Sequence, residues 1–234
     1  MSQSEYVVHL FHGWGCTSEI WKPLIGALQS HSAFRNAVFV VYDRGYSSFK
    51  STSVIPEAFA SDKKHLLFTH SMGHFFVPSG LWPHVSNWIM ISGFIQFHDV
   101  GKEQSRRVLN RMIQSMEYNS GEVLRQFHRN LFSPVEPIHS DGLVLENFDN
   151  DTLREDLIML DSAEFDISCI TDSTKLSIFH GDQDKIVPRN HAILVSEKLN
   201  ASQPIFVDNG SHAVLVTDSE IIASEVVKQL NTSF

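Results

Sequence analysis

The chain has 234 residues, of which 42% are hydrophobic, and a formal net charge of −9 at pH 7. This length and composition predict one globular domain with a sizeable core. The acidic charge argues against duplex nucleic acid as a main partner, because surfaces that bind it are normally basic. It fits better with an enzyme that acts on small or neutral substrates.

The number of cysteines and the lengths of the hydrophobic runs indicate the cellular compartment. Cys16 and Cys169 are too few for a disulfide framework, and nothing near them resembles paired zinc ligands, so we expect no metal site. The first residues, "MSQSEYVVHL", carry no basic patch ahead of a hydrophobic stretch, and no segment approaches the roughly 18 apolar residues of a membrane span. We therefore expect a soluble, cytoplasmic protein.

Short β-branched or aromatic runs alternate with helical patterns along the chain. Continuous apolar runs of this length are typical of parallel strands that are buried on both faces. The alternation predicts an α/β fold, with a mostly parallel sheet flanked by helices and joined by right-handed crossovers. The expected strands are 6–11, 37–43, 65–69, 88–92, 176–181 and 203–208, and the expected helices are 18–30, 74–82, 190–199 and 218–230.

Residues 95–165 interrupt this alternation. They carry little strand signal but contain two strongly helical stretches, "KEQSRRVLNRMIQSME" and "SGEVLRQFHRNLF", and a third near "NDTLREDLIMLD". We interpret this segment as a helical insertion, either a lid over the site or a plain decoration. The predicted organisation is a core in two parts, 1–94 and 166–234, with the helical lid at 95–165 between them.

Ser71 lies where the predicted strand 65–69 gives way to a helical run. A sharp strand-to-helix turn lifts such a serine above the edge of the sheet and points a helix N-terminus at it. The turn favours small residues two positions to either side. Gly73 fits this requirement, whereas Thr69 stands where glycine is usual, so the motif is "THSMG" rather than GxSxG. Alone, this motif is weak and also fits a simple corner.

An acid and a base follow the serine in the order that a Ser-Asp-His arrangement needs. "IFHGDQDKIVP" offers Asp182 and Asp184 after one predicted strand, and "VDNGSHAVLV" offers His212 after the next. Both loops lie at the carboxyl ends of strands, where open α/β sheets place their sites. We favour Asp184 because it lies at the loop tip, while Asp182 fits a turn residue. We expect His70 to point away from the serine and not to act as the base.

The loop "FHGWG" at residues 11–15 ends the first predicted strand and suggests an oxyanion hole. Its glycines let backbone amides approach a ligand. The expected donors are the backbone N–H groups of Met72, directly after the serine, and of Trp14. A plain glycine turn is the alternative interpretation.

Four segments, "HLFHGWGCTSEIWKPL", "LLFTHSMGHFF", "HGDQDKIVP" and "GSHAVL", occur in an order that resembles the α/β-hydrolase superfamily along almost the whole chain. The resemblance implies the α/β-hydrolase fold and a serine esterase that uses Ser71, His212 and Asp184 without a cofactor. "HGWG" with Trp21 and a short helical lid looks most like the esterases of biotin synthesis that cleave pimeloyl-[acyl-carrier protein] methyl ester. Thr69, His74 and the loop "YDRGYSS" depart from the family pattern.

In those esterases, lid arginines hold the acidic carrier protein. Residues 102–129 carry six basic and three acidic side chains, a net charge of +3 in a chain of net −9. Such a basic patch would attract an acidic partner or a phosphate group, although exposed helices also carry arginine for local ion pairs. The carrier-binding candidates, two pairs at i, i+4 spacing, are Arg107, Arg111, Arg125 and Arg129.

Two other functions fit the same residues. One is a hydrolase of the same fold that acts on short acyl esters, thioesters or a carbon–carbon bond, because it would share every catalytic residue. The other is a binding protein that keeps the pocket without turnover, which the complete set of Ser71, Asp184 and His212 makes less attractive.

Overall fold

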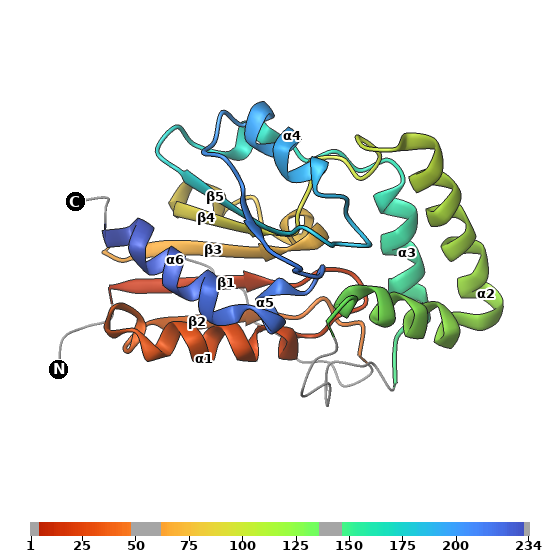
Figure 1. Ribbon diagram of the computed structural model, residues 1–234, viewed down its shortest axis with the longest axis horizontal. Coiled ribbons are helices and arrows are strands. Elements are labelled where there is room, and N and C mark those ends of the chain that lie inside the picture. The colour runs from red at the N-terminus through yellow and green to blue at the C-terminus, as the bar shows by residue number, and fades with distance from the viewer. Residues whose placement is uncertain (1–4, 48–61, 136–146, 232–234) are drawn as a thin grey trace.

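The computed structural model describes residues 5–47, 62–135 and 147–231, and within them the strands form one six-stranded sheet. Every pair of neighbouring strands is parallel, in the order β2-β1-β3-β4-β5-β6 (Figure 1). The six predicted strands are confirmed, with ends that shift by up to three residues. The strands are β1 Tyr6–Phe11, β2 Val38–Tyr42, β3 Lys64–His70, β4 Val85–Ile91, β5 Lys175–Gly181 and β6 Ile205–Val207.

The sheet is buried on both faces, which explains why its strands are apolar runs without strict alternation. Leu66 and Phe68 of β3 join one buried cluster, and Leu67 between them joins the other, because successive side chains point to opposite faces. α1 (Lys22–Ser30) and α6 (Ser219–Asn231) belong to the first cluster, and α4 (Asn190–Lys198) to the second. Figure 1 shows α1 and α6 side by side along one face of the sheet.

The described chain also contains several short helices. η1 (Ser18–Trp21) leads directly into α1, so that together they cover the helix predicted at 18–30. The remaining short elements are η2 (Ser32–Phe34), η4 (Trp82–His84), η5 (Ile167–Cys169) and α5 (Val214–Thr217).

The helix predicted at 74–82 is wrong. The chain forms only the 3-10 helix η3 (Ser71–Phe76), and Val77 is already extended, with φ −70° and ψ 123°. Pro78 explains this end, because the proline ring disfavours the helical conformation of the residue before it. The turn at Ser71 is therefore followed by a short 3-10 helix.

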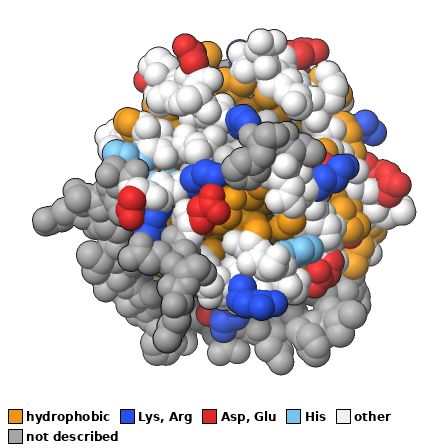
Figure 2. Space-filling model, turned by 90° about the vertical axis from the view of Figure 1, so that its left-hand side faces the viewer, with side chains coloured by type: hydrophobic (Ala, Val, Ile, Leu, Met, Phe, Trp, Pro, Cys, Tyr) orange, Lys and Arg blue, Asp and Glu red, His pale blue; other side chains and the backbone are white. Residues whose placement is uncertain are grey.

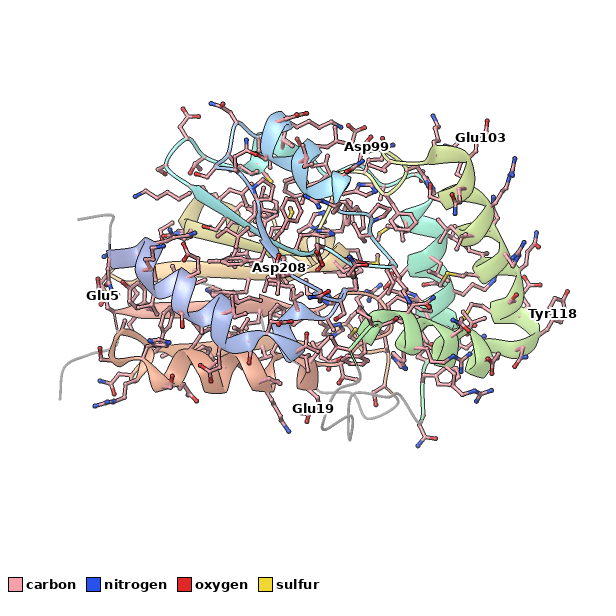
Figure 3. All side chains as sticks on the ribbon, in the orientation of Figure 1. Glu5, Glu19, Asp99, Glu103, Tyr118 and Asp208 are labelled. Carbon is pink, nitrogen blue, oxygen red and sulfur yellow. The ribbon has the colours of Figure 1, made fainter. Side chains whose placement is uncertain are left out.

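In its described part, the segment between β4 and β5 contains two α-helices, which we call the inserted helices. α2 (Lys102–Phe132) is one continuous assignment with a kink at Asn119, whose φ of −152° and ψ of 50° are not helical, and α3 (Asn150–Leu160) packs against it. Figure 3 shows Tyr118 projecting outward at this kink, and its side chain is 86% exposed. The sequence predicted these helices, whereas their function as a lid stays a prediction.

The inserted helices lie at the carboxyl ends of the strands (Figure 1). Figure 2 views the opposite end, where charges of both signs lie among apolar side chains. In the three described ranges, no helix is long and apolar enough to cross a membrane.

Candidate functional site

Ser71 occupies a strained turn between β3 and η3. Its φ of 54° lies in the left-handed region, which costs a non-glycine residue roughly 1 to 3 kcal/mol. Gly73 makes the turn fit, because a Cβ atom there would lie 2.2 Å from the carbonyl oxygen of Phe11 on β1. The fold thus maintains an unfavourable backbone conformation at Ser71, which lines the cavity described below.

Thr69, which stands where glycine is usual, has a specific contact. It is fully buried on β3, and its hydroxyl oxygen accepts a hydrogen bond of 2.8 Å from the indole Nε1–H of Trp88 on β4. Trp88 is also fully buried. The threonine therefore joins the two strands immediately before the Ser71 turn.

Replacing this threonine tests the contact. Thr69→Val keeps the shape but leaves the indole N–H of Trp88 buried without its acceptor, so we expect a loss of about 1 to 3 kcal/mol in the free energy of unfolding. Denaturant unfolding measures this loss. Thr69→Ser keeps the hydroxyl and serves as the control. A valine variant as stable as the wild type would contradict this account of Thr69.

Asp184 and His212 form a fully buried pair. The Nδ1–H of His212 donates to Asp184 Oδ2 over 2.7 Å. The other carboxylate oxygen, Oδ1, accepts the backbone N–H groups of Ile186 and Val187, both at 2.8 Å. Burial by itself would raise the pKa of Asp184, but the nearby His212 and the hydrogen bonds from His180 and His212 outweigh it and hold that pKa below its ordinary value.

The remaining ring nitrogen of His212 is the notable atom of this pair. Nε2 is buried and makes no hydrogen bond to any residue in the described ranges. Because Asp184 fixes the proton on Nδ1, Nε2 of the neutral ring carries a lone pair. No hydrogen bond joins it to Ser71 Oγ among the described atoms. Such bonds commonly tighten only when substrate binds.

His70 links the serine turn to the His212 loop. Its Nε2–H donates to the backbone carbonyl oxygen of His212 over 3.1 Å, and the two ring centroids are 4.8 Å apart. Burial, together with the charge that His212 would carry when protonated, lowers the pKa of His70 well below its ordinary value. His70 thus holds the residue predicted as the base rather than acting as a base itself.

The loop after β1 faces Ser71. A Cβ atom on Gly13 would lie 2.6 Å from Ser71 Cβ and 3.2 Å from Ser71 Oγ, so only glycine lets the backbone come this close. Trp14 is the next residue, and its backbone N–H makes no hydrogen bond within the described part of the chain. An N–H group in this position is suited to binding an oxyanion.

The inserted helices hold this loop at Trp14 and at Gly15. The indole Nε1–H of Trp14 donates to the carbonyl oxygen of Leu153 on α3 over 2.8 Å. The Nε2–H of His128 on α2 donates to the carbonyl oxygen of Gly15 over 2.7 Å. A movement of either helix would therefore disturb the position of the Trp14 backbone.

A cavity of about 430 Å³ opens beside Ser71 between the sheet and the inserted helices. This volume is in the range of small-molecule sites. Most of its wall is apolar, and the polar side chains come mainly from α2 and from Lys185. The apolar wall consists of Trp14, Met72, Phe94, Phe97, Val108, Leu109, Met112, Val123, Phe127, Leu157, Leu160 and Ile186.

The four predicted carrier-binding arginines differ in their surroundings. Arg107 forms an ion pair with Glu103, and both Arg125 and Arg129 form ion pairs with Glu122, at distances of 2.8 to 3.5 Å. Arg111 lines the cavity and has no ion pair within the described ranges. Exposed ion pairs of this kind are weak, but they reduce the positive charge that the other three present.

Sequence reasoning missed three contributors to the site. His180, at the end of β5, is 3.3 Å from Asp184 Oδ2 and supports the carboxylate from a second side. His128 holds the loop at Gly15, and Lys185 lines the cavity. Lys185 adjoins the predicted Asp184, so its place could have been inferred from the loop. No local sequence pattern could have identified His128, because its hydrogen-bond partner is a backbone oxygen 113 residues away in sequence.

No group of three or more histidine, cysteine, aspartate or glutamate side chains in residues 5–47, 62–135 and 147–231 is arranged to hold a metal ion.

No family model and no curated protein matches the chain. Solved structures, however, match the chain over almost its whole length. An esterase from Exiguobacterium antarcticum is 15% identical with a TM-score of 0.70, covering 98% of this chain and 93% of the esterase. A bromoperoxidase from Bacillus anthracis is 16% identical with a TM-score of 0.72, covering 98% and 93%, and an enol-lactonase from Burkholderia xenovorans is 12% identical with a TM-score of 0.68, covering 98% and 92%. Together with the parallel sheet and its flanking helices, these matches show that the chain has the α/β-hydrolase fold.

Proposed function

We propose that this protein is a serine carboxylic ester hydrolase. The observation that carries the proposal is the buried Asp184–His212 pair, in which His212 Nε2 has no partner in the described chain and which His70 connects to the strained turn at Ser71. The names of the similar solved structures, which include esterases and an enol-lactonase, agree with hydrolysis of an ester.

In the proposed first step, Ser71 Oγ attacks the ester carbonyl carbon while His212 Nε2 takes the hydroxyl proton. The carbonyl π electrons move to the oxygen, and Asp184 stabilises the imidazolium that forms. The tetrahedral intermediate then collapses, the alkoxide leaves with the proton from His212 Nε2, and Ser71 carries the acyl group. In the second step, water attacks the acyl group on Ser71 while His212 Nε2 takes a proton from it. The second tetrahedral intermediate then collapses, Ser71 Oγ takes that proton back, and the carboxylic acid is released.

The backbone N–H groups of Met72 and Trp14 would stabilise the negative oxygen of each intermediate. Loss of one such donor typically reduces kcat by roughly 10² to 10³. The close approach of the Gly13 backbone to Ser71 supports this role for the loop.

The cavity favours an ester with an aliphatic or otherwise apolar acyl group, because most of its wall is apolar. We propose as the specific substrate the methyl ester of pimeloyl-[acyl-carrier protein], with methanol as the leaving group. This finer proposal has support from the segment resemblance, the apolar cavity and the net positive α2. The proposal depends most on Arg111, because the charge of this side chain at the cavity is not offset by an ion pair in the described ranges. A short-chain carboxylesterase is the second candidate.

A comparison of two substrates separates these candidates. We expect the wild type to cleave pimeloyl-carrier-protein methyl ester with a higher kcat/KM than a short-chain nitrophenyl ester. If only the small ester is cleaved, the protein is a short-chain esterase. If neither ester is cleaved, the esterase proposal fails and a binding function replaces it.

Charge reversal tests the role of Arg111. Arg111→Glu is expected to reduce kcat/KM for the carrier-linked ester about tenfold or more, because a like charge would face the acidic carrier. Hydrolysis of the nitrophenyl ester should change less than about threefold. Arg35→Glu makes the same charge change at an exposed position outside the cavity lining and is the matched control. Equal kcat/KM values for the carrier-linked ester in the wild type and Arg111→Glu would remove Arg111 from the proposal.

A further inference from the structure

His74 departs from the usual glycine of the turn and contacts the serine itself. Its side chain is 1% exposed, and its Nδ1 lies 3.1 Å from the carbonyl oxygen of Ser71. Because a carbonyl oxygen only accepts, Nδ1 carries the hydrogen. The other ring nitrogen, Nε2, is buried without a hydrogen-bond partner among the described residues.

The contact has a direct geometric consequence. The carbonyl oxygen of Ser71 and the N–H of Met72 belong to the same planar peptide group, in which they point in opposite directions when the bond is trans. Among the described residues, the one cis bond is Ser133-Pro134. A donor that fixes the Ser71 oxygen therefore also fixes the direction of the Met72 N–H.

We propose that His74 is a positioning residue that aligns the Met72 N–H with the oxyanion by holding the Ser71 carbonyl oxygen. The inference rests on the proposed esterase function. The hydrogen bond also polarises the 71–72 peptide group, which strengthens the Met72 N–H as a donor.

The local fold explains why this chain needs such a restraint. A long helix after the serine would hold the turn through its own backbone, but η3 ends at Phe76 because of Pro78. Ser71 also has the strained φ of 54°. The His74 hydrogen bond supplies a restraint from a side chain at the point where the helix is short.

The ring of His74 is fixed by its surroundings. It packs against Phe75, Phe94 and Phe165 at centroid distances of 4.2, 5.7 and 5.1 Å, and lies 6.0 Å from Trp88. Trp88 is in turn bonded to Thr69, so both departures from the usual turn sequence belong to one packed unit. Burial in this apolar environment lowers the pKa of His74 to about 3, so the ring is neutral at working pH.

Three substitutions test the inference. The side-chain amide of His74→Asn places its NH₂ near the position of Nδ1, whereas His74→Gln places it near Nε2, and His74→Leu has no donor. We expect Gln and Leu to reduce kcat for the nitrophenyl ester by about 10- to 100-fold, with KM within about twofold, because the oxyanion forms only in the transition state. His74→Asn should retain kcat within about fivefold.

A space-filling role predicts the opposite order. Leucine would then preserve activity best, because asparagine is smaller and polar in an aromatic environment. The Asn and Gln variants place the same amide group in this environment. Thermal unfolding of both variants measures whether they are equally stable. Equal kcat values for Asn and Gln, or a higher value for Leu than for Asn, would overturn the positioning role while leaving the esterase proposal intact. A wild type without turnover on either ester would overturn both.

Discussion

Ser71→Ala should reduce kcat for ester hydrolysis by roughly 10⁴ to 10⁶, to the level left by binding and the oxyanion donors alone. The variant keeps the Cβ atom and the turn, so thermal unfolding should stay within a few degrees of the wild type. Steady-state hydrolysis of the nitrophenyl ester measures the loss.

Ser92→Ala is a matched control for this experiment. Ser92 is also buried, follows the next strand β4 and has a positive φ of 51°, but it does not line the cavity. We expect its kcat to change less than about threefold. A Ser71→Ala variant that retains more than about a tenth of the wild-type kcat would exclude Ser71 as the nucleophile.

Asp184→Asn should reduce kcat about 10⁴-fold with little change in fold. The asparagine carbonyl can still accept the N–H groups of Ile186 and Val187, which keeps the loop in place. Its NH₂ would then replace Oδ2 and cannot accept the Nδ1–H of His212, so the imidazole loses the tautomer that leaves Nε2 free as a base. Pre-steady-state acylation of the variant measures this step directly.

Asp182→Asn distinguishes the two aspartates that the sequence offers. Asp182 lies on the same loop, but within the described residues its side chain makes no hydrogen bond to His212, so its substitution should reduce kcat less than about tenfold. A larger loss in Asp182→Asn than in Asp184→Asn would mean that the wrong carboxylate has been assigned to His212.

The sequence predicted those parts of the site that depend on strand ends. Ser71, Asp184 and His212 follow β3, β5 and β6, and the carboxyl ends of parallel strands meet at one edge of the sheet. The apolar runs sufficed to find these strands. The role of the three residues in catalysis stays a prediction until the experiments above are done.

Other parts depend on contacts that no local pattern encodes. His128 and Leu153 bind the loop at Gly15 and Trp14 across more than 100 residues of sequence. The helical pattern at 74–82 was misleading because the apolar side chains after Ser71 pack in the core without an α-helix, and Pro78 ends the short 3-10 helix. The sequence also did not reveal the ion pairs of three α2 arginines, since charge counts do not show which glutamate each arginine contacts.

Labelling with a fluorophosphonate probe followed by peptide mass spectrometry shows directly whether Ser71 is the nucleophile, because the probe forms a covalent bond with an activated serine oxygen. We predict a single adduct on Ser71 at neutral pH, absent from Ser71→Ala and slowed in Asp184→Asn. An adduct on another residue, or no adduct in a folded wild type, would contradict the account.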